Sequence, residues 1–273
     1  MSVQKFFKEL SNNKALCDSS GEYETSFFAP IYRFGYLSSY SYYDRSVGYV
    51  VYSTVIKLAL AVFLYCELFL TEMSTLDQLA DNVNIVVIQI IGFYRYYNMS
   101  SNKAVFKELA ATMTSPYFDT TTMRRREIVQ YWCDCNYRYF KLLLSLGIAT
   151  MFAWYVYPVV DDLDYNFMIP MDLPFHYQTR VRYTYMYLTM IVFFNYFPCM
   201  VIFNDTVIQG HLINLICQFN VLADCFENML DECKRGFEDI SYNIDELVLN
   251  EDFRKHYIQR LGQLVEQHKF ILT

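Results

Sequence analysis

Four long apolar stretches constrain the fold of this chain more than any other feature. They cover residues 47–69, 83–97, 140–160 and 183–203. A helix needs about 20 mostly apolar residues to cross the core of a bilayer, and the first, third and fourth stretches meet that length. The second is shorter and ends near Arg95, whose side chain can extend from a helix end to a lipid head group. The sequence therefore predicts an all-α, polytopic membrane helix bundle with four transmembrane helices.

The composition agrees with a chain whose apolar residues are concentrated in blocks. Apolar residues make up 54% of the chain, yet the mean hydropathy is only +0.12. Charged residues make up 19%, below the roughly 25% that is typical of soluble domains. The formal net charge of −7 argues against a nucleic-acid partner. We therefore expect the lipid bilayer, and no nucleic acid, as the environment of this protein.

The loop charges predict the orientation, because Lys and Arg are retained on the cytoplasmic side. Lys and Arg number five in residues 1–46, none in 70–82, six in 98–139, two in 161–182 and six beyond 203. This alternation places the N-terminus in the cytoplasm and the loops 70–82 and 161–182 outside. The three consecutive arginines at 124–126 are most simply an anchor on the cytoplasmic side.

The chain divides into three predicted segments. Residues 1–46 are a cytoplasmic N-terminal segment, 47–203 form the four-span bundle, and 204–273 are a cytoplasmic helical region. Apolar residues continue at three-four spacing beyond the fourth span, which predicts one helix from Tyr183 to about Lys234 that extends into the cytoplasm. A last helix is predicted to start near Phe253. Its apolar spacing still continues at the final residue, so we expect a fragment that ends in a truncated fifth span.

No sequence pattern indicates catalysis or a resident metal or cofactor. The four histidines form no closely spaced pair, and no Ser–His–Asp grouping, glycine-rich loop or phosphate-binding loop is present. We therefore expect a protein that is not an enzyme and has no metal and no cofactor. A membrane-embedded enzyme remains the alternative of a different functional class.

One helix face in the third apolar stretch contains a candidate site. Gly147, Thr150, Met151 and Trp154 follow the spacing i, i+3, i+4 and i+7, so they share one stripe of a helix. Small residues beside an aromatic residue leave a concave surface. The pattern is compatible with close helix packing or with the wall of an apolar pocket.

Several short motifs occur in a particular order along the chain. The predicted outer loop before the fourth span contains Pro170-Met-Asp-Leu-Pro174-Phe175. The fourth span ends at Asp205 and continues as a long helix with Gln218, Phe219 and Leu222, and the final residues include His268-Lys-Phe-Ile271. In this order the motifs resemble the insect odorant receptor family of seven-span olfactory receptors, and the last one resembles the H-x-x-I motif that opens the family's fifth span. The resemblance extends over the whole chain but includes only the first four of the seven spans that family members usually have.

The resemblance implies an odorant receptor subunit that binds a small volatile odorant. It further implies a hetero-tetramer with the odorant receptor co-receptor, gating of a non-selective cation channel, and a place in the cell membrane of a sensory-neuron dendrite. An insect gustatory receptor is the nearest alternative, because it shares the orientation and the ligand-gated chemistry.

The resemblance also implies an apolar ligand pocket in the outer half of the bundle, formed in part by spans two to four. For the stripe in the third span, the resemblance favours the wall of a ligand pocket over close helix packing alone. The predicted set adds two residues of the second span and three of the fourth. The ligand-binding candidates are Gln89, Phe93, Gly147, Thr150, Met151, Trp154, Tyr187, Met190 and Phe194. Thr150, Gln89 or Tyr187 is expected to supply one orienting hydrogen bond.

The predicted orientation can be tested with epitope tags in intact cells. A tag at the N-terminus should be shielded from antibody, whereas a tag within residues 161–182 should be accessible. Permeabilised cells are the control, in which both tags should stain. An accessible N-terminal tag in intact cells would contradict both the topology and the family resemblance.

Overall fold

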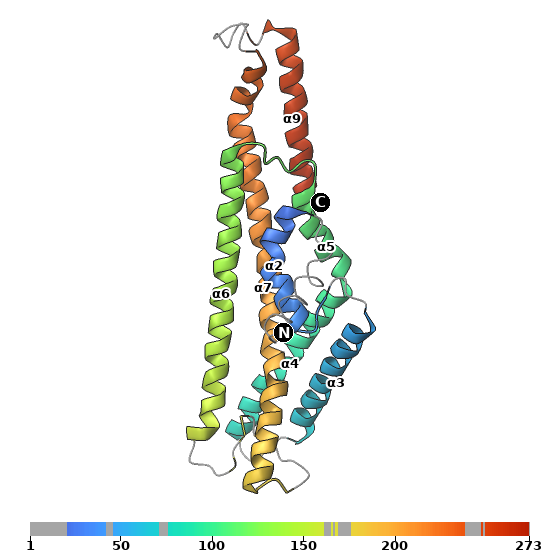
Figure 1. The fold of residues 1–273 in the computed structure, drawn as a ribbon, viewed down its shortest axis with the longest axis vertical. Helices are drawn as coiled ribbons and strands as arrows, with labels where there is room; N and C mark the ends of the chain where they lie inside the picture. Colours follow the sequence, from blue (N-terminus) through green and yellow to red (C-terminus); the bar gives the residue numbers. More distant parts are fainter. Residues whose placement is uncertain are drawn as a thin grey trace, which may run out of the picture. The chain divides into compact units, whose positions relative to one another are not determined.

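All regular secondary structure in the described part of the chain is helical, which confirms the predicted all-α class (Figure 1). The structure is a computed structural model that describes residues 21–41, 46–70, 76–160, 165, 167–168, 176–237, 247 and 249–272. The helices are α2 (Glu22–Leu37), α3 (Val47–Leu70), α4 (Leu76–Ser101), α5 (Lys103–Ala111), α6 (Met123–Val160), α7 (Arg180–Lys234) and α9 (Glu251–Leu272), with the short 3-10 helices η1 (Thr112–Thr114) and η2 (Arg235–Phe237).

Among the described residues, three helices are long and apolar enough to cross a membrane. They are α3, α6 and α7, which contain the first, third and fourth predicted spans. The second predicted span lies within α4, a helix of 26 residues. Its length is sufficient, but polar residues such as Asn84, Gln89 and Asn98 interrupt its apolar run. The finding supports a multi-pass membrane protein, and a crossing by α4 stays a prediction.

The long helix predicted beyond the fourth span is confirmed. Helix α7 runs for 55 residues without interruption and ends at Lys234, directly before the 3-10 turn that contains Gly236. Helix α9 starts two residues before its predicted start, at Glu251. The side-chain oxygen of Asn250 accepts hydrogen bonds from the backbone N–H groups of Asp252 (3.0 Å) and Phe253 (3.1 Å). Asn250 is thus an N-cap, which satisfies two backbone donors that the helix itself leaves unpaired.

Helices α6 and α2 differ from the sequence-based expectation. The third predicted span covers residues 140–160, but α6 already begins at Met123. The hydroxyl oxygen of Thr122 accepts a hydrogen bond from the N–H of Arg125 (3.3 Å), and this contact caps the start of the helix. Helix α2, in the N-terminal segment, was not expected from apolar length because it is short and amphipathic. Phe27, Phe28 and Ile31 on its inner face are almost fully buried.

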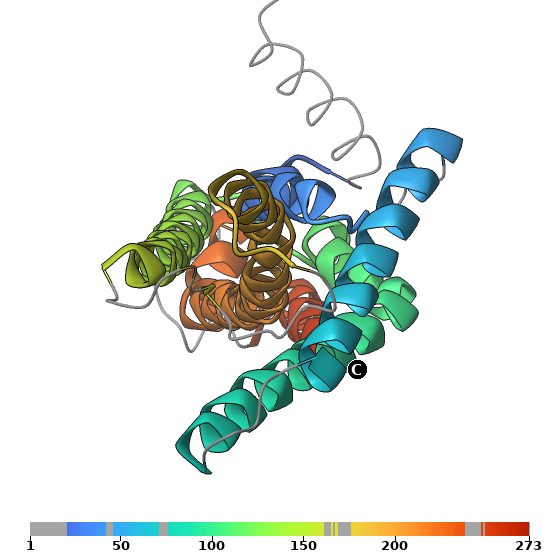
Figure 2. The ribbon, with the colours of Figure 1, turned by 90° about the horizontal axis from the view of Figure 1, so that it is seen from below.

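The described residues form two compact units, and α6 and α7 each contribute to both. The first unit includes residues 29–107 and 138–208, and the second includes 108–137 and 209–272 together with the start of α2. In the first unit, the second part of α6 and the first part of α7 run side by side (Figure 1). Helices α3 and α4 are in contact and cross each other when seen from below (Figure 2).

An ion-pair network joins the helices of the second unit. Arg125 is fully buried. Its guanidinium group donates hydrogen bonds to Asp119 (2.7 Å), to Asp224 of α7 (2.9 Å) and to Glu232 of α7. Arg260 of α9 also pairs with Asp119 and lies 3.4 Å from Glu232. The middle arginine of the triplet at 124–126 is therefore a buried structural residue, whereas the sequence suggested only a surface anchor.

The network shifts the pKa of Asp119. Burial by itself raises the pKa of this carboxyl group, but hydrogen bonds from Thr121 and Arg260 and the charge of Arg125 outweigh burial, so the pKa lies below its usual value. A carboxyl group whose pKa is lowered by folding contributes stability above its unfolded-state pKa of about 4. That contribution is lost as the pH falls through the lower, folded-state pKa.

We predict that the unfolding midpoint of the purified protein falls as the pH is lowered from about 5 to about 2, and that Asp119→Asn removes part of this dependence. At neutral pH, Asp119→Asn should cost about 2 kcal/mol, because two arginines lose a charged hydrogen-bond partner. Glu266→Gln is the control, since Glu266 is exposed and pairs only with Lys269 of the same helix (2.7 Å) among the described residues. Equal pH profiles for Asp119→Asn and the unmodified protein would contradict this assignment.

Candidate functional site

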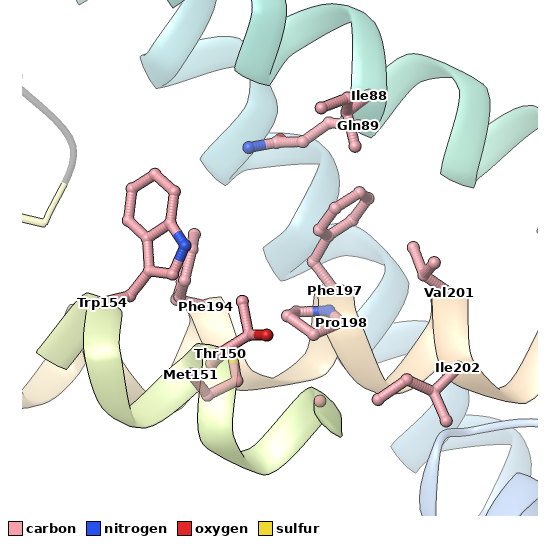
Figure 3. A pocket seen from close by; sticks show the side chains of 11 residues that line it. Ile88, Gln89, Thr150, Met151, Trp154, Phe194, Phe197, Pro198, Val201 and Ile202 are labelled. Atoms are coloured by element: carbon pink, nitrogen blue, oxygen red, sulfur yellow. The ribbon is translucent and has the colours of Figure 1, made fainter. Parts of the chain in front are cut away.

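A half-open cavity of about 330 Å³ lies between α4, α6 and α7 of the first unit (Figure 3). Ligand pockets usually have volumes of roughly 300–1,000 Å³, so this cavity lies at the small end of that range. Its wall is almost entirely apolar. The lining residues are Ile88, Gln89, Gly147, Thr150, Met151, Trp154, Phe194, Phe197, Pro198, Val201 and Ile202.

Helical periodicity explains why these residues meet. On α6 the lining residues are the predicted stripe from Gly147 to Trp154. On α7 they follow the spacing i, i+3, i+4, i+7 and i+8 from Phe194 to Ile202, which again is one face of a helix. The two stripes face each other across the cavity, and Gly147 of α6 lies against Ile202 of α7. Helix α4 contributes the adjacent residues Ile88 and Gln89.

Two glycines allow α7 to approach its neighbours closely. A Cβ atom added to Gly147 of α6 would lie 2.3 Å from Cδ1 of Ile202. A Cβ atom added to Gly92 of α4 would lie 2.9 Å from the ring of Phe197. Small residues at helix contacts in membranes serve this purpose. Gly147 therefore takes part in close helix packing and also lines the cavity, so the two interpretations of the stripe are not exclusive.

Pro198 changes the hydrogen bonding of α7 at the cavity wall. Proline has no N–H group, so the carbonyl of Phe194, four residues earlier, lacks its usual helical donor. Both residues line the cavity. The helix nevertheless continues through this position.

The three polar residues of the wall differ in their hydrogen bonding. The Thr150 hydroxyl donates to the carbonyl of Leu146 (2.9 Å). Gln89 is buried and interacts with another group of the protein. The indole N–H of Trp154 has no hydrogen-bond acceptor among the residues that the structure describes. Figure 3 shows the indole nitrogen on the edge of the ring that faces Phe194 and Thr150. Trp154 thus offers the open donor of the wall.

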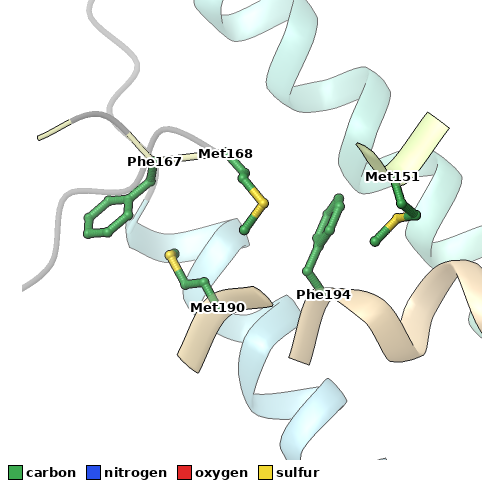
Figure 4. Packing of buried hydrophobic residues seen from close by; sticks show 5 residues of the cluster. All are labelled: Met151, Phe167, Met168, Met190 and Phe194. Atoms are coloured by element: carbon green, nitrogen blue, oxygen red, sulfur yellow. The ribbon is translucent and has the colours of Figure 1, made fainter. Parts of the chain in front are cut away.

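A buried apolar cluster adjoins the cavity and shares Met151 and Phe194 with it (Figure 4). Phe167, Met168 and Met190 complete the cluster, and Trp154 and Tyr187 pack against it. Trp154 and Phe194 are also neighbours, with ring centroids 5.8 Å apart. The cluster therefore packs against the part of the cavity wall that Met151 and Phe194 form.

Six of the nine predicted residues line the cavity. They are Gln89, Gly147, Thr150, Met151, Trp154 and Phe194. Met190 lies in the adjoining cluster. The Tyr187 hydroxyl donates to the carbonyl of Tyr155 (2.7 Å). The Phe93 ring packs against Phe197, with centroids 6.1 Å apart. These three residues support the wall from outside the cavity, because their side chains turn to other neighbours.

Five lining residues were not predicted. They are Ile88, Phe197, Pro198, Val201 and Ile202. The three-four spacing that connects Phe194 with Tyr187 also continues toward Ile202, so the sequence contained a signal for the residues of α7. This spacing was not followed beyond Phe194, because the pocket was expected only in the outer half of the fourth span.

Comparison with known families supports a functional interpretation of this region. A family model described as 7tm Odorant receptor matches residues 75–273, which include every residue of the cavity wall. No curated protein sequence matches the chain. In the part of the chain that the structure describes, no three His, Cys, Asp or Glu side chains form a group that could hold a metal ion.

The close contact at Gly147 predicts a difference between two Gly→Ala variants. Gly262 of α9 has no neighbouring atom within 4 Å of an added Cβ atom, so Gly262→Ala should stabilise the protein by about 0.5–1 kcal/mol. Gly147→Ala should gain less, because the Cδ1 methyl group of Ile202 has to move to make room for the added Cβ atom. Thermal unfolding of both variants in detergent measures the difference. An equal gain for Gly147→Ala would show that the helices are less closely packed than the structure indicates.

Proposed function

The chain belongs to the odorant receptor family, and we propose that its cavity between α4, α6 and α7 binds small volatile odorants. The single observation that carries this proposal is a predominantly apolar cavity whose lining residues all lie within the segment that matches the family. The family match favours an odorant receptor over a gustatory receptor, which was the nearest alternative from the sequence.

The size of the cavity suits a volatile molecule. Its volume of about 330 Å³ lies at the lower end of the roughly 300–1,000 Å³ that is usual for ligand pockets, which fits a small molecule. Burial of apolar surface, worth about 25 cal/mol per Å² before the cost of association, is the main source of affinity. The rings of Trp154, Phe194 and Phe197 and the flexible thioether of Met151 adapt to ligands of different shape.

One hydrogen bond orients the ligand in this proposal. The N–H of Trp154 is the open donor at the wall, so a ligand with an acceptor oxygen, such as a ketone or an ester, gains a bond that a hydrocarbon cannot form. Such a bond contributes about 0.5–1.5 kcal/mol. Thr150, Gln89 and Tyr187, which the sequence suggested for this role, already interact with other groups of the protein.

The proposal also includes the signalling step that follows ligand binding. We propose that ligand binding gates a cation channel that the chain forms together with a co-receptor, as a hetero-tetramer in the membrane of a sensory neuron. Membership of the odorant receptor family supports this assignment, and the apolar helices α3, α6 and α7 support its membrane location.

Tryptophan fluorescence can test ligand binding directly, because the chain has only two tryptophans. In a Trp132→Phe variant, Trp154 at the cavity is the only indole. Titration of the purified variant with a short bromoalkane, which quenches on contact, should give saturable quenching. The matched control is Trp154→Phe, which keeps Trp132 outside the cavity and should show only a weak, non-saturating response. Identical, non-saturating curves for both variants would contradict the proposed function.

The same variant tests the preference for an acceptor oxygen. A ketone should displace the bromoalkane at about a three- to tenfold lower concentration than a hydrocarbon of the same skeleton, which corresponds to the hydrogen bond from Trp154. Equal competition by ketone and hydrocarbon would show that Trp154 does not donate a hydrogen bond to the ligand. Saturable quenching in that case would still support an apolar odorant site.

A further inference from the structure

We propose that Arg95 of α4 and Asp205 of α7 form a latch that sets the separation of these two helices beside the cavity and thereby controls its affinity for ligands. Nη2 of Arg95 lies 2.5 Å from Oδ1 of Asp205. This inference rests on the proposed function, because it takes the cavity as the ligand site. Arg95 and Asp205 are positioning residues in this proposal, since neither lines the cavity.

The ion pair lies on the same helix faces as the cavity wall. On α4, Ile88, Gly92 and Arg95 follow the spacing i, i+4 and i+7. On α7, Pro198, Val201 and Asp205 follow the spacing i, i+3 and i+7. Both faces are therefore continuous from the cavity to the ion pair.

A single layer of contacts separates the latch from the cavity. It consists of Gly92 against Phe197 and Val201, where a Cβ atom added to the glycine would lie 2.9 Å and 3.2 Å from these side chains. Both partners on α7 also line the cavity. A change in the distance between α4 and α7 at the ion pair is thus transmitted to the wall over less than two helical turns.

The electrostatics favour a pair that remains closed. The side chains of Arg95 and Asp205 are 39% and 41% exposed, so each retains some contact with the surroundings but is partly desolvated. A charge near the apolar part of a membrane is costly unless it is paired. Removal of one partner leaves the other side chain without its counter-charge between α4 and α7. Arg95, which the sequence suggested would extend to a lipid head group, has a protein partner 110 residues away.

The separation of α4 and α7 affects affinity because dispersion contacts are short-ranged. A gap of about 0.5–1 Å forfeits roughly a quarter to a half of the attraction between two atoms. If the latch opens, Ile88 and Gln89 move away from a ligand that remains in contact with α6 and α7. The ligand then loses contacts along one wall of the cavity, and its affinity falls.

The test combines charge reversal with the quenching assay in the Trp132→Phe protein. Arg95→Asp and Asp205→Arg should each raise the bromoalkane concentration at half-saturation by about tenfold or more. The double variant restores the ion pair with opposite polarity and should return this concentration to within about threefold of the parent protein. Arg182→Gln is the control, because Arg182 is exposed and its side chain contacts the carbonyl of His176 (3.0 Å) at the start of α7.

The outcomes distinguish the latch from the proposed function. Absence of saturable quenching in the parent Trp132→Phe protein would contradict the proposal that the cavity binds a ligand. Saturable quenching with an unchanged midpoint in both single variants would overturn the latch alone. Weakened binding in the single variants without recovery in the double variant would also overturn it, because a latch requires the pair and not one residue.

A conservative variant keeps the test informative if charge reversal prevents folding. Arg95→Lys retains the positive charge but shortens the reach and removes the fork of the guanidinium group. We expect a folded protein, judged by gel filtration and thermal unfolding, with a midpoint raised about two- to fivefold. An unchanged midpoint in folded Arg95→Lys would show that the geometry of the pair does not position the cavity wall.

Discussion

The close approach of α7 to glycines on two other helices is the constraint on which the first unit depends. Ile202 occupies the space beside Gly147 of α6, and Phe197 occupies the space beside Gly92 of α4. Because both large side chains come from α7, this helix packs against α6 and α4 at the same time. The cavity lies beside these glycine contacts, and Trp154 and Phe194 also line it.

Ion pairs connect separate segments of the chain within each unit. Arg95 pairs with Asp205 in the first unit, and Arg125 pairs with Asp119, Asp224 and Glu232 in the second. At the cavity wall, the indole N–H of Trp154 has no hydrogen-bond acceptor in the described part of the chain. An open donor in an apolar cavity favours a ligand that supplies the acceptor, and this gives the proposed odorant site its chemical preference.

Much of the fold could be predicted from local patterns, because a helix in lipid satisfies its own backbone hydrogen bonds. Length and apolar spacing were sufficient to place α3 and the whole of α7, including its extension to Lys234. The start of α6 at Met123 was not predicted because the polar residues before 140 hide the continuity of the helix. Helix α2 was not predicted because it is too short for a span. Its stability depends on packing of Phe27, Phe28 and Ile31 against other elements.

The sequence by itself determined which residues share a helix face, because a period of 3.6 residues is a local property of the backbone. It therefore grouped Gly147, Thr150, Met151 and Trp154 correctly on one stripe of α6. Only the tertiary structure decided which stripe of α7 faces that one, since rotation and depth depend on contacts with other helices. For this reason Phe197, Val201 and Ile202 line the cavity while Tyr187 and Met190 pack beside it. The pairing of Arg95 with Asp205 has the same origin: two charges 110 positions apart meet only when α4 and α7 are packed together.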